Sequence, residues 1–261
     1  MRTRLAAGRL LLRLGRFTQS LAVMVMRPRD LVEFNRAAYF RPQSVDDWAE
    51  DSLVDAGLSP DEKELIAHVP VHDGELLLLG VGGGREAVPL AAMGFRVTGI
   101  DFVPELAARA QENARKRGQS IKVLVQEMSR LHVPESAYDV AWLAAGTYSS
   151  IPTRRLRLDL LDRLRRSLKP GGYFLCQFLL SGDRDFRGGW EFLRRAFSWL
   201  TRGNLSYAPG DKIVAGVEFV HYFSGLDDVR SEFEAAGFRV LDLTTPASGP
   251  RGGAVLKNDG R

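Results

Sequence analysis

Residues 75–101, ELLLLGVGGGREAVPLAAMGFRVTGID, constrain the fold more than any other segment of the chain. The apolar run at 75–79 predicts a buried strand, and the glycines after it predict a loop that a ligand approaches closely, because glycine has no Cβ. A helix is expected up to Met93, ended by Gly94, and "FRVTGI" predicts the second strand. Asp101 follows that strand, where a carboxylate accepts hydrogen bonds from both hydroxyls of a ribose. Strand, loop, helix and acid at these spacings predict a site for a ligand that carries a ribose.

Strands and helices alternate along the rest of the chain. This alternation predicts an α/β fold with a doubly wound, mostly parallel sheet whose central strands are apolar because helices cover both faces. The strands are expected at 75–79, 95–100, 121–126, 138–144, 171–180, 212–223, 238–245 and 252–258.

Two regions lie outside this alternation. Residues 1–70 are expected to form a helical N-terminal extension, in which Ser59 and Glu62 have the spacing of a helix capping box. Residues 71–261 are expected to form the main domain, and an insertion rich in Gly, Arg and aromatic residues interrupts it at about 181–215.

The glycines alone fit two classes of ligand. Residues 82–87 match G-x-G-x-x-A, a form of the dinucleotide-binding fingerprint, whereas residues 80–84 match G-x-G-x-G. The dinucleotide alternative, an NAD(P)-dependent oxidoreductase, lacks support elsewhere, because none of the six tyrosines is followed by a lysine in a Tyr-x-x-x-Lys pair.

The segments downstream, taken in order, resemble those of class I S-adenosylmethionine-dependent methyltransferases. "VTGIDFVPELAARA" resembles their second motif, "VQEMSRL" the end of their third strand, "YDVAWLAAGTYSSIP" their fourth-strand motif and "LLDRLRRSLKPGGYFLC" their turn into strand five. "LDDVRSEFEAAGFRVLDL" is similar to their final helix and antiparallel strand pair. The resemblance covers roughly residues 72–257. It implies a Rossmann-like, seven-stranded sheet with an antiparallel C-terminal strand, and S-adenosyl-L-methionine as the cofactor.

The same resemblance implies a set of cofactor-binding residues. Asp101 would hold the ribose, and Glu127 would meet the adenine amino group with Met128 beside it. The other members of the set are Gly80, Gly82, Gly84, Arg85, Phe102 and Leu143. Arg85 either meets the cofactor carboxylate or is an exposed arginine without a partner. Leu78 departs from the pattern, because these enzymes usually have Asp or Glu there, two residues before the first glycine, to help hold the cofactor's amino group.

Methyl transfer from a sulfonium mainly requires proximity and in-line orientation, with a base where the acceptor is a hydroxyl. His221 and Tyr148 are the candidate catalytic residues. A histidine has the more suitable pKa, but in "VHYFSG" it also fits an ordinary strand end.

The acceptor is expected to be a small or lipid-like molecule, methylated on oxygen or nitrogen, because the [DN]-P-P-[YF] motif of nucleic-acid amino methyltransferases is absent. Aromatic residues of the insertion either cap this acceptor or form the insertion's own core. They are Phe186, Trp190, Phe192, Phe197, Trp199 and Tyr207.

The N-terminus is rich in arginine: seven arginines and no acidic residue precede Asp30, although the whole chain carries a formal net charge of only +4. Residues 1–29 are therefore a helix docked by its leucines, a peripheral membrane contact or a transit peptide. The charge is too mild to indicate a specific nucleic-acid partner. Because no apolar run is long enough to span a membrane, a cytoplasmic location is expected.

Cysteine and histidine give no sign of a metal site. The single cysteine, Cys176, lies in a strand-like apolar run and is expected to be buried and inert, and the four histidines show no metal-binding spacing. The competing function is a non-catalytic, methyltransferase-like binding module whose basic N-terminus contacts a membrane or RNA. Leu78 is the observation that favours it.

Overall fold

The structure is a computed structural model of the 261-residue chain. It describes residues 15, 18–19, 21–143, 145–181, 191–245 and 249–260, with the side chains of residues 191–194 left out. Of the sequence predictions, residues 1–14 of the arginine-rich segment, Phe186, Trp190 and the side chain of Phe192 lie outside the described part.

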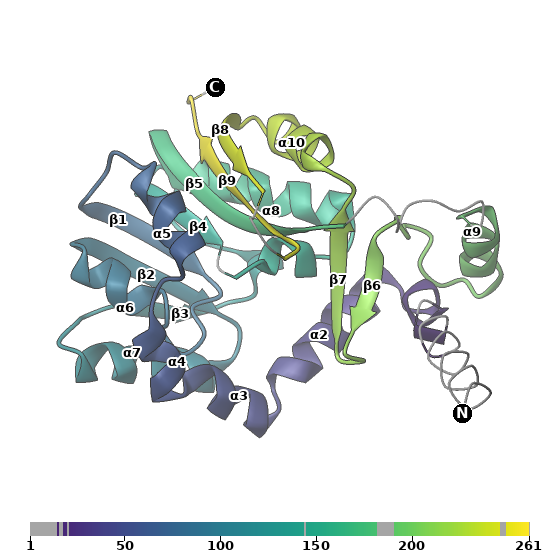
Figure 1. The fold of residues 1–261 in the computed structure, drawn as a ribbon, viewed down its shortest axis with the longest axis horizontal. Helices are drawn as coiled ribbons and strands as arrows, with labels where there is room; N and C mark the ends of the chain where they lie inside the picture. Colours follow the sequence, from purple (N-terminus) through teal and green to yellow (C-terminus); the bar gives the residue numbers. More distant parts are fainter. Residues whose placement is uncertain are drawn as a thin grey trace, which may run out of the picture.

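A parallel sheet in the order β3-β2-β1-β4-β5 forms the centre of the fold (Figure 1). Strand β9 pairs with β5 in antiparallel orientation, and β8 pairs with β9. These seven strands confirm the predicted doubly wound sheet with its antiparallel C-terminal strand. Their bounds are β1 Gly74–Leu79, β2 Phe95–Asp101, β3 Lys122–Val125, β4 Tyr138–Leu143, β5 Leu168–Leu180, β8 Arg239–Thr244 and β9 Arg251–Lys257.

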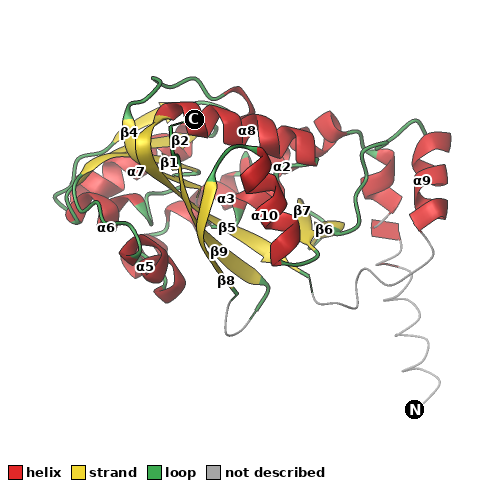
Figure 2. Cartoon of the chain, turned by 90° about the horizontal axis from the view of Figure 1, so that it is seen from above, coloured by secondary structure: helices red, strands yellow, loops and turns green. Residues whose placement is uncertain are grey.

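Helices cover both faces of this sheet (Figure 2). Because side chains alternate along a strand, Leu77 and Leu79 of β1 pack with α8 and α10, whereas Leu76 and Leu78 pack with α5, α6 and α7. All four leucines are fully buried. The helices are α5 Pro60–Ala67, α6 Ala87–Ala92, α7 Pro104–Lys116, α8 Arg154–Ser167 and α10 Leu226–Ala235, and the 3-10 turns are η1 Met128–Arg130 and η2 Thr147–Ser150.

The N-terminal extension is helical over its described part. It contains α2 Pro28–Tyr39, α3 Pro42–Ala49, α4 Asp51–Ala56 and α5. The predicted capping box at the start of α5 is present: the Ser59 hydroxyl accepts from the Glu62 amide, and the Glu62 carboxylate accepts from the Ser59 amide. Glu62 is fully buried although it is charged, which matters for the site described below.

The segment 212–223 is two strands, not the single strand predicted from its apolar pattern. Strands β6 Asp211–Val214 and β7 Glu218–Phe223 form an antiparallel hairpin. Ala215 and Gly216 both have positive φ, at 51° and 72°, and the Val217 amide donates to the Val214 carbonyl across the turn. Two consecutive positive φ values match the twist of paired strands, so a turn centred on these residues closes the hairpin, and three residues, 215–217, separate the paired Val214 and Glu218. Strand β7 also pairs in parallel with the end of β5, so the hairpin brings the described sheet to nine strands, two more than the seven predicted.

The extension and the insertion pack against each other. Val23, Met24 and Leu31 from the N-terminal side share one small core with Tyr207, Ile213 and Phe219. Partly buried Phe197, on α9 Glu191–Leu200, packs on the same core. In Figure 1, α2 accordingly lies beside the β6–β7 hairpin. Among the described residues, none of the helices combines the length and the apolar character that crossing a bilayer requires.

Candidate functional site

The glycine loop joins β1 to α6 at the carboxyl end of the sheet. The Gly80 and Val81 amides both donate to the Ile100 carbonyl, at 2.8 and 3.1 Å, which ties the loop to β2. Gly82 has φ of 51°, and a Cβ there would meet nothing within 4 Å, so this side of the loop is open. Gly83 faces the other way, because a Cβ there would overlap the Trp48 carbonyl oxygen. The loop is thus held under α3 and exposed on the opposite side.

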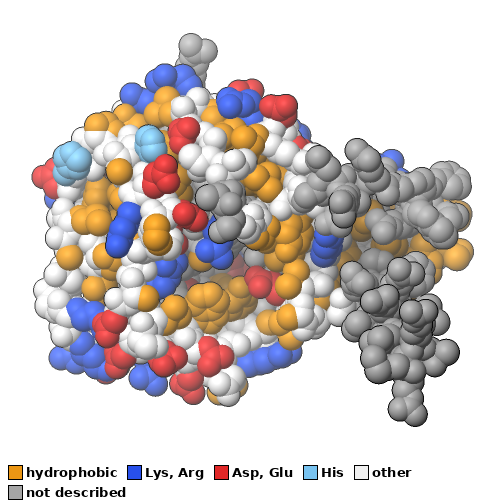
Figure 3. Space-filling model, in the orientation of Figure 1, with side chains coloured by type: hydrophobic (Ala, Val, Ile, Leu, Met, Phe, Trp, Pro, Cys, Tyr) orange, Lys and Arg blue, Asp and Glu red, His pale blue; other side chains and the backbone are white. Residues whose placement is uncertain are grey.

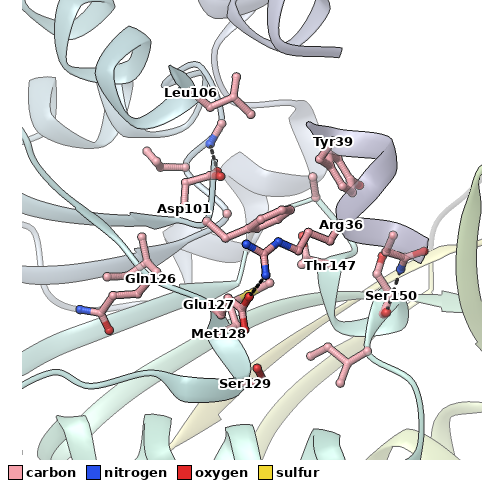
Figure 4. A pocket seen from close by; sticks show the side chains of 18 of the residues that line it. Arg36, Tyr39, Asp101, Leu106, Gln126, Glu127, Met128, Ser129, Thr147 and Ser150 are labelled. Carbon is pink, nitrogen blue, oxygen red and sulfur yellow. Dashed lines mark hydrogen bonds and ion pairs between the residues drawn. The ribbon is translucent and has the colours of Figure 1, made fainter. Parts of the chain in front are cut away.

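Asp101, at the end of β2, fixes the open side of the loop. Its Oδ2 accepts from the Gly82 amide at 2.9 Å, and its Oδ1 accepts from the Val103 amide at 3.0 Å (Figure 4). Its side chain is buried, and burial raises the pKa of this carboxyl even though the two amide donors act in the opposite direction. A buried carboxylate at this place is ready to accept further hydrogen bonds from a ligand.

A cavity runs from the glycine loop across the carboxyl end of the sheet, and Figure 3 shows it as a hollow in the face seen in Figure 1. Seven of the predicted cofactor-binding residues line it: Gly80, Gly82, Arg85, Asp101, Phe102, Glu127 and Met128. Gly84 and Leu143 are not among the lining residues. A Cβ at Gly84 would touch the backbone of Ala110 in α7, and Leu143 is fully buried in the sheet core.

Helix α2 covers the cavity beside Glu127. The Arg36 guanidinium donates to Glu127 Oε1 at 2.6 Å, and Figure 4 shows the two side chains meeting inside the site. The rings of Tyr39 and Phe40 pack on Phe102, with centroids 5.9 and 5.7 Å apart. No site residue was predicted on α2. The available signal was Asn35, four residues after Leu31 and therefore a polar residue on the buried face of an amphipathic helix.

A second polar group lies where α2, η2 and β7 meet. Glu218 Oε1 accepts from the Tyr39 hydroxyl at 2.8 Å and from the Ser150 hydroxyl at 3.1 Å. Burial, together with the Glu218 carboxylate, raises the pKa of Tyr39 well above its ordinary value. Asn35 joins the three elements, because its amide donates to the carbonyls of Ser150 and Phe219 and accepts from the Phe219 amide at 2.6 Å.

Arg85 has partners, contrary to the alternative of an exposed, unpaired arginine. Its two terminal nitrogens donate to the two carboxylate oxygens of Glu62 at 2.7 Å each, and one also donates to the Gly57 carbonyl. It contacts Glu86 as well. Burial raises the pKa of the Glu86 carboxyl to about 7.

The structure does not bring His221 or Tyr148 to this cavity. The Tyr148 hydroxyl donates to Glu232 at 2.6 Å, and its ring is fully buried and stacked on Phe223. His221 Nδ1 lies 2.7 Å from Asp211 Oδ1 in the hairpin, and its ring is also buried against Phe223. Both side chains therefore make their contacts within the folded core and not in the cavity. Cys176 is buried as predicted, and burial raises the pKa of its thiol.

The aromatic residues of the insertion take several different positions. Phe197 and Tyr207 pack on the small core shared with the extension, whereas Trp199 is 73% exposed. None of these three lines the cavity. Among the described residues of the insertion, two of these aromatic side chains therefore join a core that the insertion shares with the N-terminal extension, which is neither of the two predicted arrangements.

Residues 76–172 match a family model described as a methyltransferase domain. These residues form a methyltransferase domain. The matched residues include most of β1, the glycine loop, Asp101 and the turn into β5. The methyltransferase reading of the glycines is thus confirmed, and the dinucleotide alternative is not.

Curated relatives of this methyltransferase include ubiquinone biosynthesis O-methyltransferases. It is 28% identical over 195 residues to a ubiquinone biosynthesis O-methyltransferase of Methylobacterium nodulans, covering 71% of this chain and 68% of the relative. It is 36% identical over 144 residues, 55% of each chain, to the enzyme of the same name from Paramagnetospirillum magneticum. The chain therefore spans from about half to about two thirds of the length of these relatives.

Solved structures share its fold. The 1,6-didemethyltoxoflavin-N1-methyltransferase of Burkholderia thailandensis, solved with 1,6-didemethyltoxoflavin and S-adenosylhomocysteine, has a TM-score of 0.62 at 18% identity, over 88% of this chain and 89% of that one. A SAM-dependent methyltransferase of Methanosarcina mazei has a TM-score of 0.59 at 21% identity, over 77% and 98% of the two chains.

The residues at the glycine loop fit S-adenosylmethionine. The loop offers an open backbone surface at Gly82, the buried Asp101 carboxylate lies directly behind it, and Glu127 and Met128 follow β3 on the same cavity. This donor set suits a nucleoside with ribose hydroxyls and an exocyclic amino group.

Proposed function

We propose that this methyltransferase transfers the methyl group of S-adenosylmethionine to a hydroxyl of a small, largely apolar acceptor bound between α2 and β7. The observation that carries the proposal is a single cavity that reaches both the glycine loop and the Tyr39–Ser150–Glu218 group. The first part suits the cofactor, and the second suits a hydroxyl whose proton must leave.

Asp101, Glu127 and the loop would hold the cofactor. Asp101 would accept hydrogen bonds from the ribose hydroxyls, and Glu127 would accept one from the adenine amino group. The sulfonium supplies an activated methyl group and leaves as a neutral thioether. Phe102 and Met128 give the nucleoside an apolar contact on the same wall. The chain's own contribution to these steps is binding and orientation.

Glu218 is the proposed base at the acceptor end. A carboxylate within hydrogen-bond reach of an acceptor hydroxyl takes its proton as the oxygen–methyl bond forms. Tyr39 and Ser150 already donate to Glu218 Oε1, so they fix the orientation of this carboxylate. Ile151, Pro152 and other apolar residues line the same cavity and favour an acceptor with an apolar body. The names of two relatives, ubiquinone biosynthesis O-methyltransferases, support O-methylation of a small molecule.

The test is an assay of methyl transfer to a panel of phenols, catechols and alcohols. The amount of S-adenosylhomocysteine released measures the reaction. With an accepted substrate, Glu218→Gln is expected to lower kcat by roughly 100-fold, within the usual range for general base catalysis, and to leave S-adenosylhomocysteine binding unchanged. Asp101→Asn should instead weaken S-adenosylhomocysteine binding. Glu234→Gln, at an exposed carboxylate of α10, is the control. Full activity of Glu218→Gln would remove Glu218 as the base.

We further propose that the end of α9 contacts an anionic membrane surface. The three most exposed large apolar side chains that the structure describes are Trp199, Leu200 and Leu205, each at least 70% exposed. They share one groove with Arg27 and Arg202. Apolar side chains next to arginines suit a surface with acyl chains below negatively charged headgroups.

Vesicle co-sedimentation separates this proposal from simple exposure. The protein is expected to bind phosphatidylglycerol vesicles and not phosphatidylcholine vesicles, with a blue shift of tryptophan fluorescence that Trp199→Phe reduces. Trp199→Ser combined with Leu205→Ser should abolish binding, whereas Leu241→Ser, at a 42% exposed position of β8, should not. Equal binding of both variants, or binding to RNA alone, would contradict membrane contact.

A further inference from the structure

Glu62, Arg85 and Glu86 form a buried charged cluster beside the glycine loop. Their side chains are 0%, 15% and 5% exposed, in that order. Arg85 and Glu86 both line the cavity. With all three groups ionised, the cluster has two negative charges and one positive charge.

Glu62 receives most of the hydrogen bonds that the cluster provides. It receives two hydrogen bonds from Arg85 and one from the Ser59 amide, and these donors lower the pKa of its carboxyl. Glu86 receives only part of the charge of a guanidinium that is already engaged. Among the described residues, the charged groups that act on Glu86 are Arg85, which favours the carboxylate, and Glu62, which opposes it. A buried carboxylate in this state requires another cation or a proton.

Leu78 points to the cation that would neutralise Glu86. Related enzymes usually have an acid at this position to hold the amino group of the cofactor. Here Leu78 is fully buried and packs with Leu58, Val81 and Trp142 on the side of the sheet covered by α5, α6 and α7. The methionine end of S-adenosylmethionine carries an ammonium group. Position 78 therefore supplies no carboxylate for this group.

We propose that Glu86 binds the α-ammonium group of the cofactor's methionine end, in place of the acid that Leu78 replaces. The inference rests on S-adenosylmethionine being the methyl donor. In this arrangement Arg85, held by Glu62, positions the Glu86 carboxylate toward the cavity. The ammonium group brings the charge of the cluster to zero when the cofactor binds.

Calorimetric titration with two ligands tests the assignment. S-adenosylhomocysteine has the amino-acid end, whereas 5′-methylthioadenosine has the same nucleoside without it. At pH 8, Glu86→Gln is expected to weaken S-adenosylhomocysteine binding by roughly tenfold or more, the scale of a lost charge-assisted hydrogen bond, and to leave 5′-methylthioadenosine binding unchanged. Glu64→Gln, at an exposed residue of α5, is the control.

A pH series gives a second measurement that a merely structural role would not reproduce. In the wild type, affinity for S-adenosylhomocysteine should rise between pH 6 and 8 as the Glu86 carboxyl ionises, and affinity for 5′-methylthioadenosine should stay constant. The variant should lose this pH dependence. Equal weakening of both ligands, or no weakening, would overturn the assignment. If wild type fails to bind S-adenosylhomocysteine at all, the proposed function fails instead.

Discussion

The buried ion pair between α8 and α10 gives the sharpest stability prediction. Arg157 Nε and Nη2 donate to the two oxygens of Glu232 at 2.8 and 2.7 Å, and both side chains are about 97% buried. Arg157→Met keeps the apolar stem and removes the guanidinium. The Glu232 carboxylate then stays buried without its main partner. The free-energy cost of this unpaired charge is larger than the net stabilisation that the intact ion pair provides.

The expected cost follows from the donors that remain. Removing one member of a buried ion pair typically costs about 3–5 kcal/mol. Here Tyr148 still donates to Glu232 at 2.6 Å, and Arg154 Nε lies 3.9 Å away on a half-exposed side chain. These two groups place the expected loss at the lower end, about 3 kcal/mol. For a chain of this size the urea midpoint should fall by about 1 M.

Urea unfolding followed by circular dichroism measures this loss. The matched control is Arg155→Met on the same helix, because Arg155 is 90% exposed and 4.0 Å from Asp159, a surface pair that contributes little. Combining Arg157→Met with Glu232→Met should recover part of the stability, since no charge is left buried, while the buried Tyr148 hydroxyl loses its acceptor. The reasoning is refuted if Arg157→Met is no more destabilising than Arg155→Met, or if the double variant is less stable than the single one.

Three further predictions concern the site and the core. Gly83→Ala should weaken S-adenosylhomocysteine binding at least tenfold, because its Cβ overlaps the Trp48 carbonyl, whereas Gly118→Ala, at a φ of 71° in open space, should lower stability without weakening binding. The Glu86 carboxyl has a folded-state pKa raised from 4.5 to about 7, so it stabilises the fold fully below pH 4.5 and loses this contribution as pH rises through about 7. In urea unfolding, the free energy of unfolding should therefore fall by about 3 kcal/mol as the pH is raised through this range, and Glu86→Gln should remove this pH dependence. Cys176 should not react with a thiol reagent until the protein unfolds, and rapid labelling of the folded chain would contradict its burial.

The cofactor half of the site was accessible from the sequence because its residues are set by local patterns. An apolar strand, a glycine loop and an acid after the next strand occupy one crossover, so Gly82 and Asp101 come together without knowledge of distant contacts. The capping box at Ser59 is local in the same sense.

The acceptor half was not accessible, because it depends on contacts between distant segments. Asn35 and Phe219 are 184 residues apart in the chain, and no periodicity within either segment indicates that they meet. The β6–β7 turn at Ala215 and Gly216 lacks the Asn-Gly or Asp-Gly signal of most such hairpins. His221 was chosen for its chemistry, but the hairpin register places it opposite Asp211, which takes up its ring nitrogen.

The Asn35 amide ties the N-terminal extension to the proposed acceptor site. One side chain joins α2, the 3-10 turn after β4 and strand β7, so the roof of the cavity and its far wall form one unit. The central sheet need not change when that unit is altered by substitution, so substitutions at this joint can change the proposed acceptor site and leave the glycine loop as it is. A fragment beginning at residue 71 would therefore lose Asn35 and this wall of the proposed acceptor site, together with the contacts of α3 and α5 to the glycine loop and the sheet.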